Sequence, residues 1–198
     1  GALPRLFDRN ASDARLIWLI VVGTIPAVIA GLLFKSQIEE HLRTPAIAAA
    51  MLAAGALLFF VAEAVGAKTR PESSLTLGEA LLIGCAQAVA FIPGVSRSGA
   101  TITVALFLGL RRAEAARFIF LLAIPAILGA AASEAPKMLK AGLGDTAPLF
   151  LIGIASSAIV GYAAVKYFIR YLGNHSIAVF AWYRLALAGV TAIWLWRA

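Results

Sequence analysis

The organisation of this chain follows from the stretch Phe91-Ile92-Pro93-Gly94-Val95-Ser96-Arg97-Ser98-Gly99-Ala100-Thr101. It is a polar, turn-forming segment between two apolar arms, which run over residues 78–90 and 102–110. An arginine is costly to place in apolar surroundings, and within a membrane segment it is a candidate functional residue. We therefore interpret this segment as a loop that holds a phosphate group inside a membrane protein.

The composition is that of an integral membrane protein. Hydrophobic residues make up 62% of the chain and the mean hydropathy is +0.91, against about 45–50% apolar residues in soluble domains. The net charge of +7 does not indicate nucleic-acid binding, because the basic residues gather in loops between apolar runs, where they set topology and contact lipid headgroups. We expect membrane lipids as partners and no nucleic acid.

Long uncharged runs predict the membrane spans. Residues 16–34 carry no charge, and these 19 residues rise about 28 Å as a helix, enough for one bilayer crossing. The same argument gives spans at about 46–65, 118–132, 147–169 and 177–196. We predict an all-α integral membrane protein, a helical bundle that forms one polytopic domain over residues 1–198.

The central stretch is too short to cross the membrane twice. The arm from Ala100 to Leu110 reaches about 17 Å as a helix, about half a bilayer. Two short arms joined by a Pro-Gly loop predict a re-entrant helix-loop-helix hairpin over about 77–110. Such a hairpin leaves ten basic residues on one face and five on the other, whereas a full crossing leaves eight and seven. The richer face is predicted to be cytoplasmic, with the C-terminus outside.

The loop has the chemistry of an anion cradle. Gly94 and Gly99 allow a tight turn and a close approach to a ligand, and Arg97 offers a planar fork of N–H groups that matches phosphate oxygens. A helix that opens near Gly99 to Thr101 would add its free N–H groups and its positive dipole end. Hydroxyl donors come from Ser96, Ser98 and Thr101. The alternative is that Arg97 pairs with backbone carbonyls and only locks the loop.

Other candidate residues surround this loop in the sequence. Gln87, in the first arm, is predicted either to hydrogen-bond towards the cavity or to bridge structural elements. Glu79 stands at the mouth of the hairpin. Tyr183 and Arg184, near one end of the last span, are candidates to contact a headgroup or to pair with a carboxylate such as Glu63.

The sequence near Arg97 lacks the rest of a phosphatase site. Phosphate-ester hydrolysis needs a nucleophile, a general acid or base, and often a metal held by carboxylates. The two histidines, His41 and His175, are predicted to lie in exposed loops, and no acidic pair stands near Arg97. We expect half of an active site.

Residues 93–101 closely resemble the second signature of the undecaprenyl-diphosphate phosphatases, the BacA/UppP family. Three further segments are similar to that family: Gly-Thr-Ile-Pro-Ala at 23–27, Phe-Ile-Phe-Leu-Leu-Ala-Ile-Pro at 118–125, and Phe-Ala-Trp-Tyr-Arg at 180–184. The resemblance implies hydrolysis of a C55 polyprenyl diphosphate to the monophosphate lipid carrier of cell-wall synthesis. It also implies the bacterial inner membrane, bacitracin resistance, and an inverted repeat in which each half has one re-entrant hairpin and three spans.

The match to that pattern is partial. Two predicted spans precede the hairpin and three follow it, so a first hairpin and one span are expected upstream of this sequence. The family's first signature, a glutamate-rich segment followed by Pro-Val-Ser-Ser-Thr-Gly-His, is absent. Catalytic roles therefore carry over only to Ser96, Arg97 and Ser98. The resemblance places the ligands of a divalent cation, Mg²⁺ or Ca²⁺, in the absent segment. It also makes a homodimer a candidate assembly, and catalysis by this chain alone is an open question.

Two other functions use similar parts. A lipid-phosphate carrier or flippase could bind its cargo in the same cradle, and it would move labelled lipid between leaflets without releasing phosphate. A phosphatase of the phosphatidic-acid type carries a histidine a few residues beyond its Ser-Arg pair. Here residues 98–103 read Ser-Gly-Ala-Thr-Ile-Thr, which disfavours that type.

Overall fold

The computed structural model describes residues 12–141 and 147–197. Its elements, in chain order, are α1 (Ser12–His41), α2 (Pro45–Val65), the 3₁₀ turn η2 (Glu72–Ser74), α3 (Leu77–Val89), α4 (Arg97–Phe107), α5 (Arg112–Ala141), α6 (Ala147–Asn174) and α7 (Ala178–Arg197). The described part contains no β-strand, only one isolated bridge between Arg70 and Leu110. The prediction of an all-α fold is confirmed.

Five helices are long and apolar enough to cross a membrane. Their qualifying segments are Asp13–Phe34, Pro45–Val65, Arg112–Lys137, Ala147–Asn174 and Ala178–Arg197. The chain is therefore an integral membrane protein. Pro45 opens α2, where Thr44 caps the helix by accepting the N–H of Ile47.

Several helices extend beyond the predicted spans. The sequence predicted a span that ends at about residue 132, but α5 continues to Ala141 and contains both Pro125 and Pro136. The predicted end is not the end of the helix, because loss of hydrophobicity does not end a helix. The polar continuation contains good helix formers, and Glu134 pairs with Lys137 one turn later at 2.9 Å. In the same way α1 continues to His41, seven residues past Phe34.

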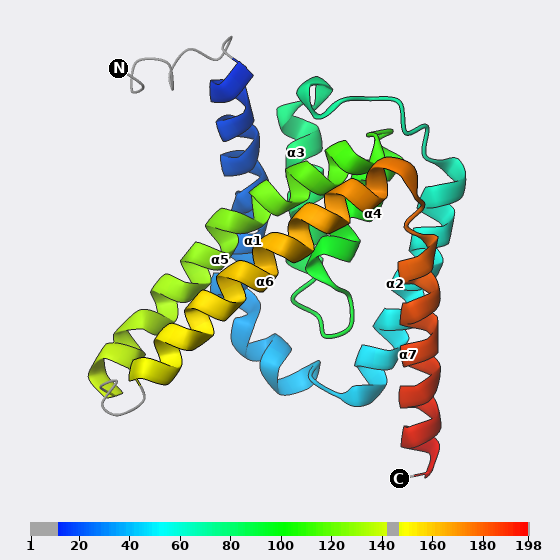
Figure 1. Ribbon diagram of the computed structural model, residues 1–198. Coiled ribbons are helices and arrows are strands. Elements are labelled where there is room, and N and C mark those ends of the chain that lie inside the picture. Colours follow the sequence, from blue (N-terminus) through cyan, green and yellow to red (C-terminus); the bar gives the residue numbers. More distant parts are fainter. Residues whose placement is uncertain (1–11, 142–146, 198) are drawn as a thin grey trace.

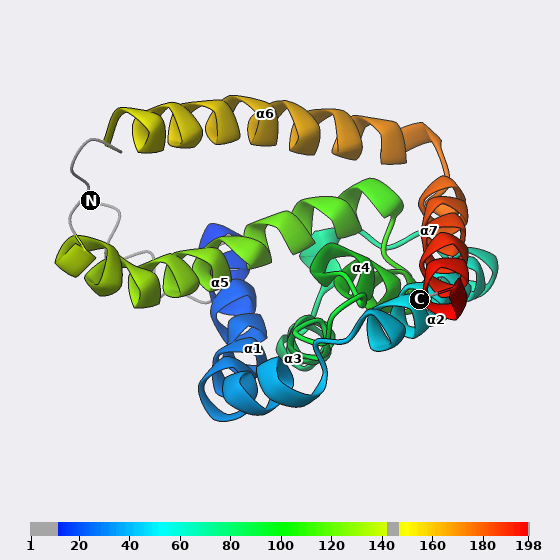
Figure 2. The same ribbon diagram turned by 90° about the horizontal axis from the view of Figure 1, so that it is seen from below.

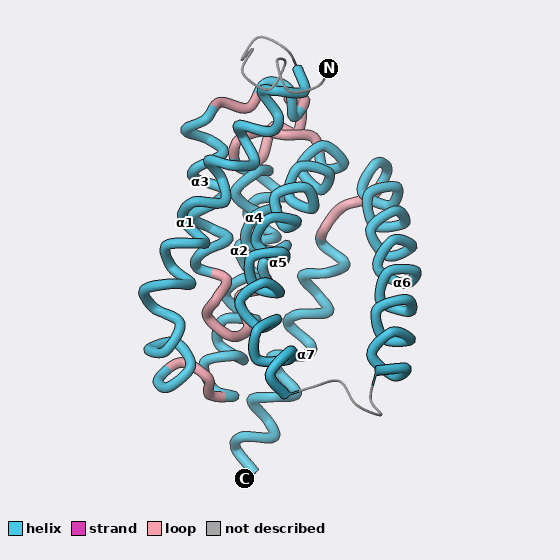
Figure 3. The backbone as a smooth tube through the Cα atoms, turned by 90° about the vertical axis from the view of Figure 1, so that its left-hand side faces the viewer, coloured by secondary structure: helices cyan, strands magenta, loops and turns pink. Residues whose placement is uncertain are grey.

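The two short helices α3 and α4 lie within a frame of longer ones. Helix α1 packs along α3, α2 packs along α7, and α5 crosses over α1 and α4 (Figure 1). Helix α6 lies in a layer of its own beside α5 (Figure 2), and among the described residues it buries only Leu172. The tube in Figure 3 shows the α3–α4 loop inside this frame.

The core lies around the hairpin. Leu75, Ile83, Leu106, Phe118 and Leu122 are fully buried there, on the loop before α3 and on α3, α4 and α5. Small residues let the helices approach closely. A Cβ on Gly84 of α3 would collide with the backbone of Gly23 on α1. Close packing around α3 and α4 fixes the position of the loop between them.

Arg70 holds the two ends of the hairpin together. Its side chain donates to Glu79 Oε1 at 2.7 Å, at the start of α3, and to the Leu108 carbonyl at 2.8 Å, just after α4. The Arg70 backbone N–H donates to the Gly109 carbonyl at 2.9 Å, and its carbonyl accepts from the Arg111 N–H at 2.9 Å. Both ends therefore lie at one end of the molecule, and the loop lies between that end and the α1–α2 connection (Figure 1). Re-entry of this hairpin into a bilayer stays a prediction.

Candidate functional site

The tip of the hairpin has an unusual backbone. Gly94 has φ +88°, and a Cβ there would collide with the backbone of Ala48 on α2. Ser96 has φ +70°, a conformation that a residue with a side chain adopts only at a cost and that concentrates at functional sites. Helix α4 begins at the next residue, Arg97. The turn is therefore pressed against α2 and aims the start of α4 in a fixed direction.

Ser96 caps helix α4. Its Oγ accepts the N–H of Gly99 at 3.2 Å, which leaves its hydroxyl hydrogen available as a donor. The N–H groups of Arg97 and Ser98 belong to the first turn and have no acceptor within the helix. Free N–H groups and the helix dipole favour an anion at this position. The predicted helix opening is confirmed, two residues earlier than the sequence suggested.

Arg97 is exposed at this helix start. In the part of the chain that the structure describes, its guanidinium has no hydrogen-bond or ion-pair partner. The alternative in which Arg97 locks the loop through backbone carbonyls therefore does not hold among these residues. Five N–H donors remain for a ligand.

Arg184 occupies the locking role instead. It lies on α7, is only 6% exposed, and donates to the carbonyl of Gly94 at 2.9 Å in the hairpin loop. It also donates to Met51 and Leu52 carbonyls on α2, at 3.2 and 3.4 Å. This buried guanidinium links three segments that are far apart in sequence.

The predicted pairing of Arg184 with Glu63 is wrong. The Glu63 carboxylate accepts from Arg112 Nε at 3.0 and 3.2 Å, and Arg112 Nη2 donates to it as well. It also accepts the Ile177 N–H at 3.3 Å, where the chain enters α7. The prediction failed because the sequence does not show that Arg112, at the start of α5, lies within hydrogen-bond distance of Glu63, whereas Arg184 on α7 binds backbone carbonyls instead.

A cavity of about 290 Å³ adjoins the hairpin tip. Among the predicted site residues, those that line it are Ser96, Ser98, Gly99, Tyr183 and Arg184. Aromatic walls come from Phe59 of α2, Phe168 of α6 and Phe180 of α7. The sequence analysis missed these three; only Phe180 carried a signal, because it lies one helical turn before Tyr183 and Arg184. The cavity thus combines aromatic walls with two serines and Arg184. Arg97 stands between those serines in the sequence but is not among the residues that line the cavity.

The other predicted site residues lie elsewhere. Thr101 is buried, and its hydroxyl donates to the Arg97 carbonyl at 2.8 Å, so it stabilises the first turn of α4. Gln87 is 3% exposed and does not line the cavity; its Nε2 has no partner among the described residues. Glu79 is bound at the hairpin base. The hydrogen bond from Arg70 lowers the pKa of its carboxyl to about 2.

The described residues do not fit a divalent-cation site. They contain no group of three or more His, Cys, Asp and Glu side chains that could hold a metal ion. Glu63 and Glu79, the two carboxylates named as candidates from the sequence, are already bound to Arg112 and Arg70. The hairpin tip offers hydroxyls and a guanidinium, and a guanidinium does not bind a cation.

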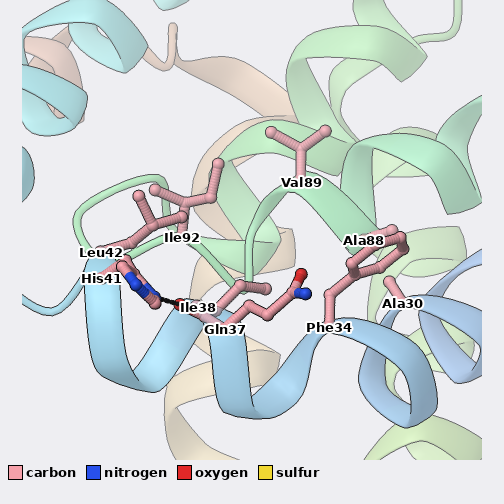
Figure 4. Close-up of a pocket in the computed structure, with 9 residues that line it drawn as sticks. All are labelled: Ala30, Phe34, Gln37, Ile38, His41, Leu42, Ala88, Val89 and Ile92. Carbon is pink, nitrogen blue, oxygen red and sulfur yellow. Dashed lines mark hydrogen bonds between the residues drawn. The ribbon is translucent and has the colours of Figure 1, made fainter.

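A second hollow, of about 600 Å³, lies on the other side of the hairpin. Figure 4 shows its mostly apolar lining, which includes Phe34 and Ile38 of α1, Val89 at the end of α3 and Ile92 in the loop that follows. His41 lies at its edge, with Nδ1 3.2 Å from the carbonyl of Gln37. No predicted catalytic residue lines this hollow.

The fold and the site define a class of protein. It is a polytopic membrane protein with a serine–arginine–serine turn at the head of a short helix, next to a partly apolar cavity. The chain belongs to the BacA family: the model for the bacitracin resistance protein BacA matches residues 2–190.

Curated relatives match this sequence over most of its length. An undecaprenyl-diphosphatase of Rubrobacter xylanophilus is 45% identical over 192 residues, which are 96% of this chain and 71% of the relative. One of Geotalea daltonii has the same identity and coverage. One of Thermodesulfovibrio yellowstonii is 46% identical over 178 residues, 90% of this chain and 68% of the relative. These relatives are longer than the part that this chain matches.

Proposed function

We propose that this chain acts in the hydrolysis of undecaprenyl diphosphate to undecaprenyl phosphate and inorganic phosphate. The reaction would recycle the lipid carrier of cell-wall synthesis in a bacterial inner membrane. The observation that carries the proposal is the unpartnered guanidinium of Arg97, between two serines that line the cavity. Family membership and the names of the relatives support it.

The residues of the tip suit a diphosphate. The reaction breaks the bond between the terminal phosphorus and the bridging oxygen, and water supplies the oxygen of the released phosphate. Negative charge then grows on the bridging oxygen, which stays with the lipid. A fork of guanidinium N–H groups and the free N–H groups of the first α4 turn would stabilise that charge as it develops. We assign this role to Arg97.

The two serines have different environments. The Oγ of Ser96 accepts the Gly99 N–H and is therefore partly engaged as a helix cap. The described hydrogen bonds do not involve the hydroxyl of Ser98, which is exposed and lines the cavity. Both remain candidates for donating to phosphate oxygens, and the freer Ser98 is the better placed of the two to act as a nucleophile. Its oxygen would bond to the terminal phosphorus as the bridging P–O bond breaks, and a base outside the described residues would accept its proton. Water would then cleave the phosphoserine and release phosphate.

A divalent cation is retained as a proposed requirement, with ligands outside the described residues. A homodimer also stays a proposal. The alternative function, a transporter that moves a lipid phosphate between leaflets, is not favoured by any relative reported above, since all three are named as diphosphatases.

Phosphate release from undecaprenyl diphosphate in detergent tests the proposal. We would compare this chain with a chimera that adds the segments of the Rubrobacter relative that lie outside the match. The chimera is expected to release phosphate, and its Arg97→Ala variant is expected to lose the activity. Arg197→Ala, which removes an exposed arginine at the far end of α7, is the matched control. A chimera that folds and moves labelled lipid across vesicles without releasing phosphate would favour the carrier and reject the hydrolase.

A further inference from the structure

We propose that Arg184 and Gly55 form a clamp that positions the hairpin tip, and that Arg184 acts on the reaction through the Gly94 carbonyl. This inference rests on the proposed function where activity is the readout. Its structural part, the fixing of residues 91–99, can be tested without activity.

The clamp spans three segments of the chain. Arg184 on α7 lies 132 positions from Leu52 on α2 and 90 from Gly94 in the loop, yet it donates to the carbonyls of both. Its guanidinium carbon also lies 5.4 Å from the centroid of the Phe59 ring, a cation–π distance. Because an unpaired guanidinium is costly to bury, these contacts together hold the side chain in one place.

Gly55 makes the space for this guanidinium. A Cβ at Gly55 would lie 3.0 Å from Arg184 Cζ and 3.4 Å from Nε, and closer still to Nη2. These atoms end a flexible side chain rather than a backbone, so a methyl group at position 55 would displace the guanidinium without breaking α2. Gly55 therefore leaves a notch on α2 that the Arg184 guanidinium occupies. Helix α7, which carries Arg184, packs along α2 (Figure 1).

The clamp acts two residues before the candidate catalytic turn. Gly94 is already fixed by its positive φ and by contact with Ala48, and the Arg184 bond fixes the direction of its carbonyl. The next peptide units lead directly to Ser96 and Arg97. An error of about 1 Å in the placement of reacting groups can lower a rate about 100-fold. Arg184 is therefore a positioning residue, and Arg97 is the group to which the proposed function assigns the substrate contact.

The test is a double-mutant cycle on the active chimera with Arg184→Ala, Gly55→Ala and both together. Each single change is expected to lower kcat by roughly 100-fold with a smaller change in KM. The double variant should be no slower than Arg184→Ala alone, because a methyl group at position 55 has nothing left to displace. Gly189→Ala is the control. Gly189 lies on the same helix as Arg184, and a Cβ there would meet nothing within 4 Å.

Two further measurements separate positioning from substrate contact. Arg184→Lys keeps the charge but loses the planar fork, so it should not restore kcat. Hydrogen exchange of the chain itself should become roughly tenfold faster at residues 91–99 in Arg184→Ala and Gly55→Ala, with the rest of α2 and α7 unchanged.

The outcomes are distinct. Additive losses in the double variant, full rescue by lysine, or unchanged exchange at the tip would each overturn the clamp. If the unmutated chimera releases no phosphate, the proposed function fails. The exchange measurement alone then decides whether Arg184 and Gly55 fix residues 91–99.

Discussion

The arginines at the base and at the tip of the hairpin differ in whether their side chains have hydrogen-bond partners within the protein. At the base, Arg70 donates to Glu79, to the Leu108 carbonyl and to Ser74, so its donors are engaged within the protein. At the tip, Arg97 has no partner among the described residues and stands at the start of a helix. An arginine whose donors are filled holds a structure together. An arginine left free where its neighbours favour anions is a candidate to bind a ligand.

The largest expected effect concerns Arg97. Arg97→Ala should lower phosphate release by about 1,000-fold or more, the range known for arginines that stabilise a transferring phosphoryl group. The melting temperature should hardly change, because the side chain is exposed and has no hydrogen-bond or ion-pair partner among the described residues. Arg70→Ala should do the reverse, with a clear fall in melting temperature and a smaller loss of activity per folded molecule. Equal loss of stability in both variants would remove the distinction between base and tip.

Substitution of one glycine at the tip and one at the base tests how tightly the backbone is packed at each place. Gly94→Ala puts a Cβ into the backbone of Ala48 and a side chain at φ +88°, so it should destabilise the fold by about 1–3 kcal/mol or more. Gly78→Ala, at the base, adds a Cβ that meets nothing within 4 Å and should be close to neutral. Denaturant or thermal unfolding in detergent would measure both. A neutral Gly94→Ala would mean that the tip is not pressed against α2.

Removal of the helix cap should give a smaller effect. Ser96→Ala loses the hydrogen bond that the Gly99 N–H donates to Oγ, at a cost of about 1 kcal/mol of stability. Ser96→Gly also loses that bond, but glycine adopts φ +70° without strain. The Ser96→Gly variant should therefore have a higher melting temperature than Ser96→Ala. Comparison of the two melting temperatures checks this order. The reverse order would show that the backbone at Ser96 is not strained.

The smallest effect is a dependence of stability on pH at the hairpin base. The Arg70 hydrogen bond lowers the pKa of Glu79 from its ordinary 4.5 to about 2. A carboxyl whose folded-state pKa is lowered stabilises the fold above its unfolded value, and that contribution disappears as pH falls from about 4.5 towards 2. Glu79→Gln should therefore flatten the melting-temperature profile in that window. An unchanged profile would show that the pair adds no stability.

Local properties of the sequence predicted most of the fold. The spans followed from uncharged apolar runs, and the hairpin followed from two short arms around Pro93-Gly94. Where helices continued into polar segments, as α5 does past residue 132, hydrophobicity marked the span but not the helix end. The site was predicted in part: Ser96, Ser98 and Gly99 do line the cavity, whereas the Thr101 hydroxyl is used inside α4.

The sequence by itself determined that this is an all-α membrane protein with a serine–arginine–serine turn between two half-length helices. Those features depend on neighbouring residues, through hydrophobicity, helix length and turn chemistry. Only the tertiary structure decided which arginine is free. Arg97 and Arg184 both stand in apolar surroundings in the sequence, but carbonyls from α2 and the hairpin loop converge on Arg184 alone. A hydrogen bond needs its partners within about 3 Å, and only the packing of α7 on α2 brings residues more than 100 positions apart to that distance.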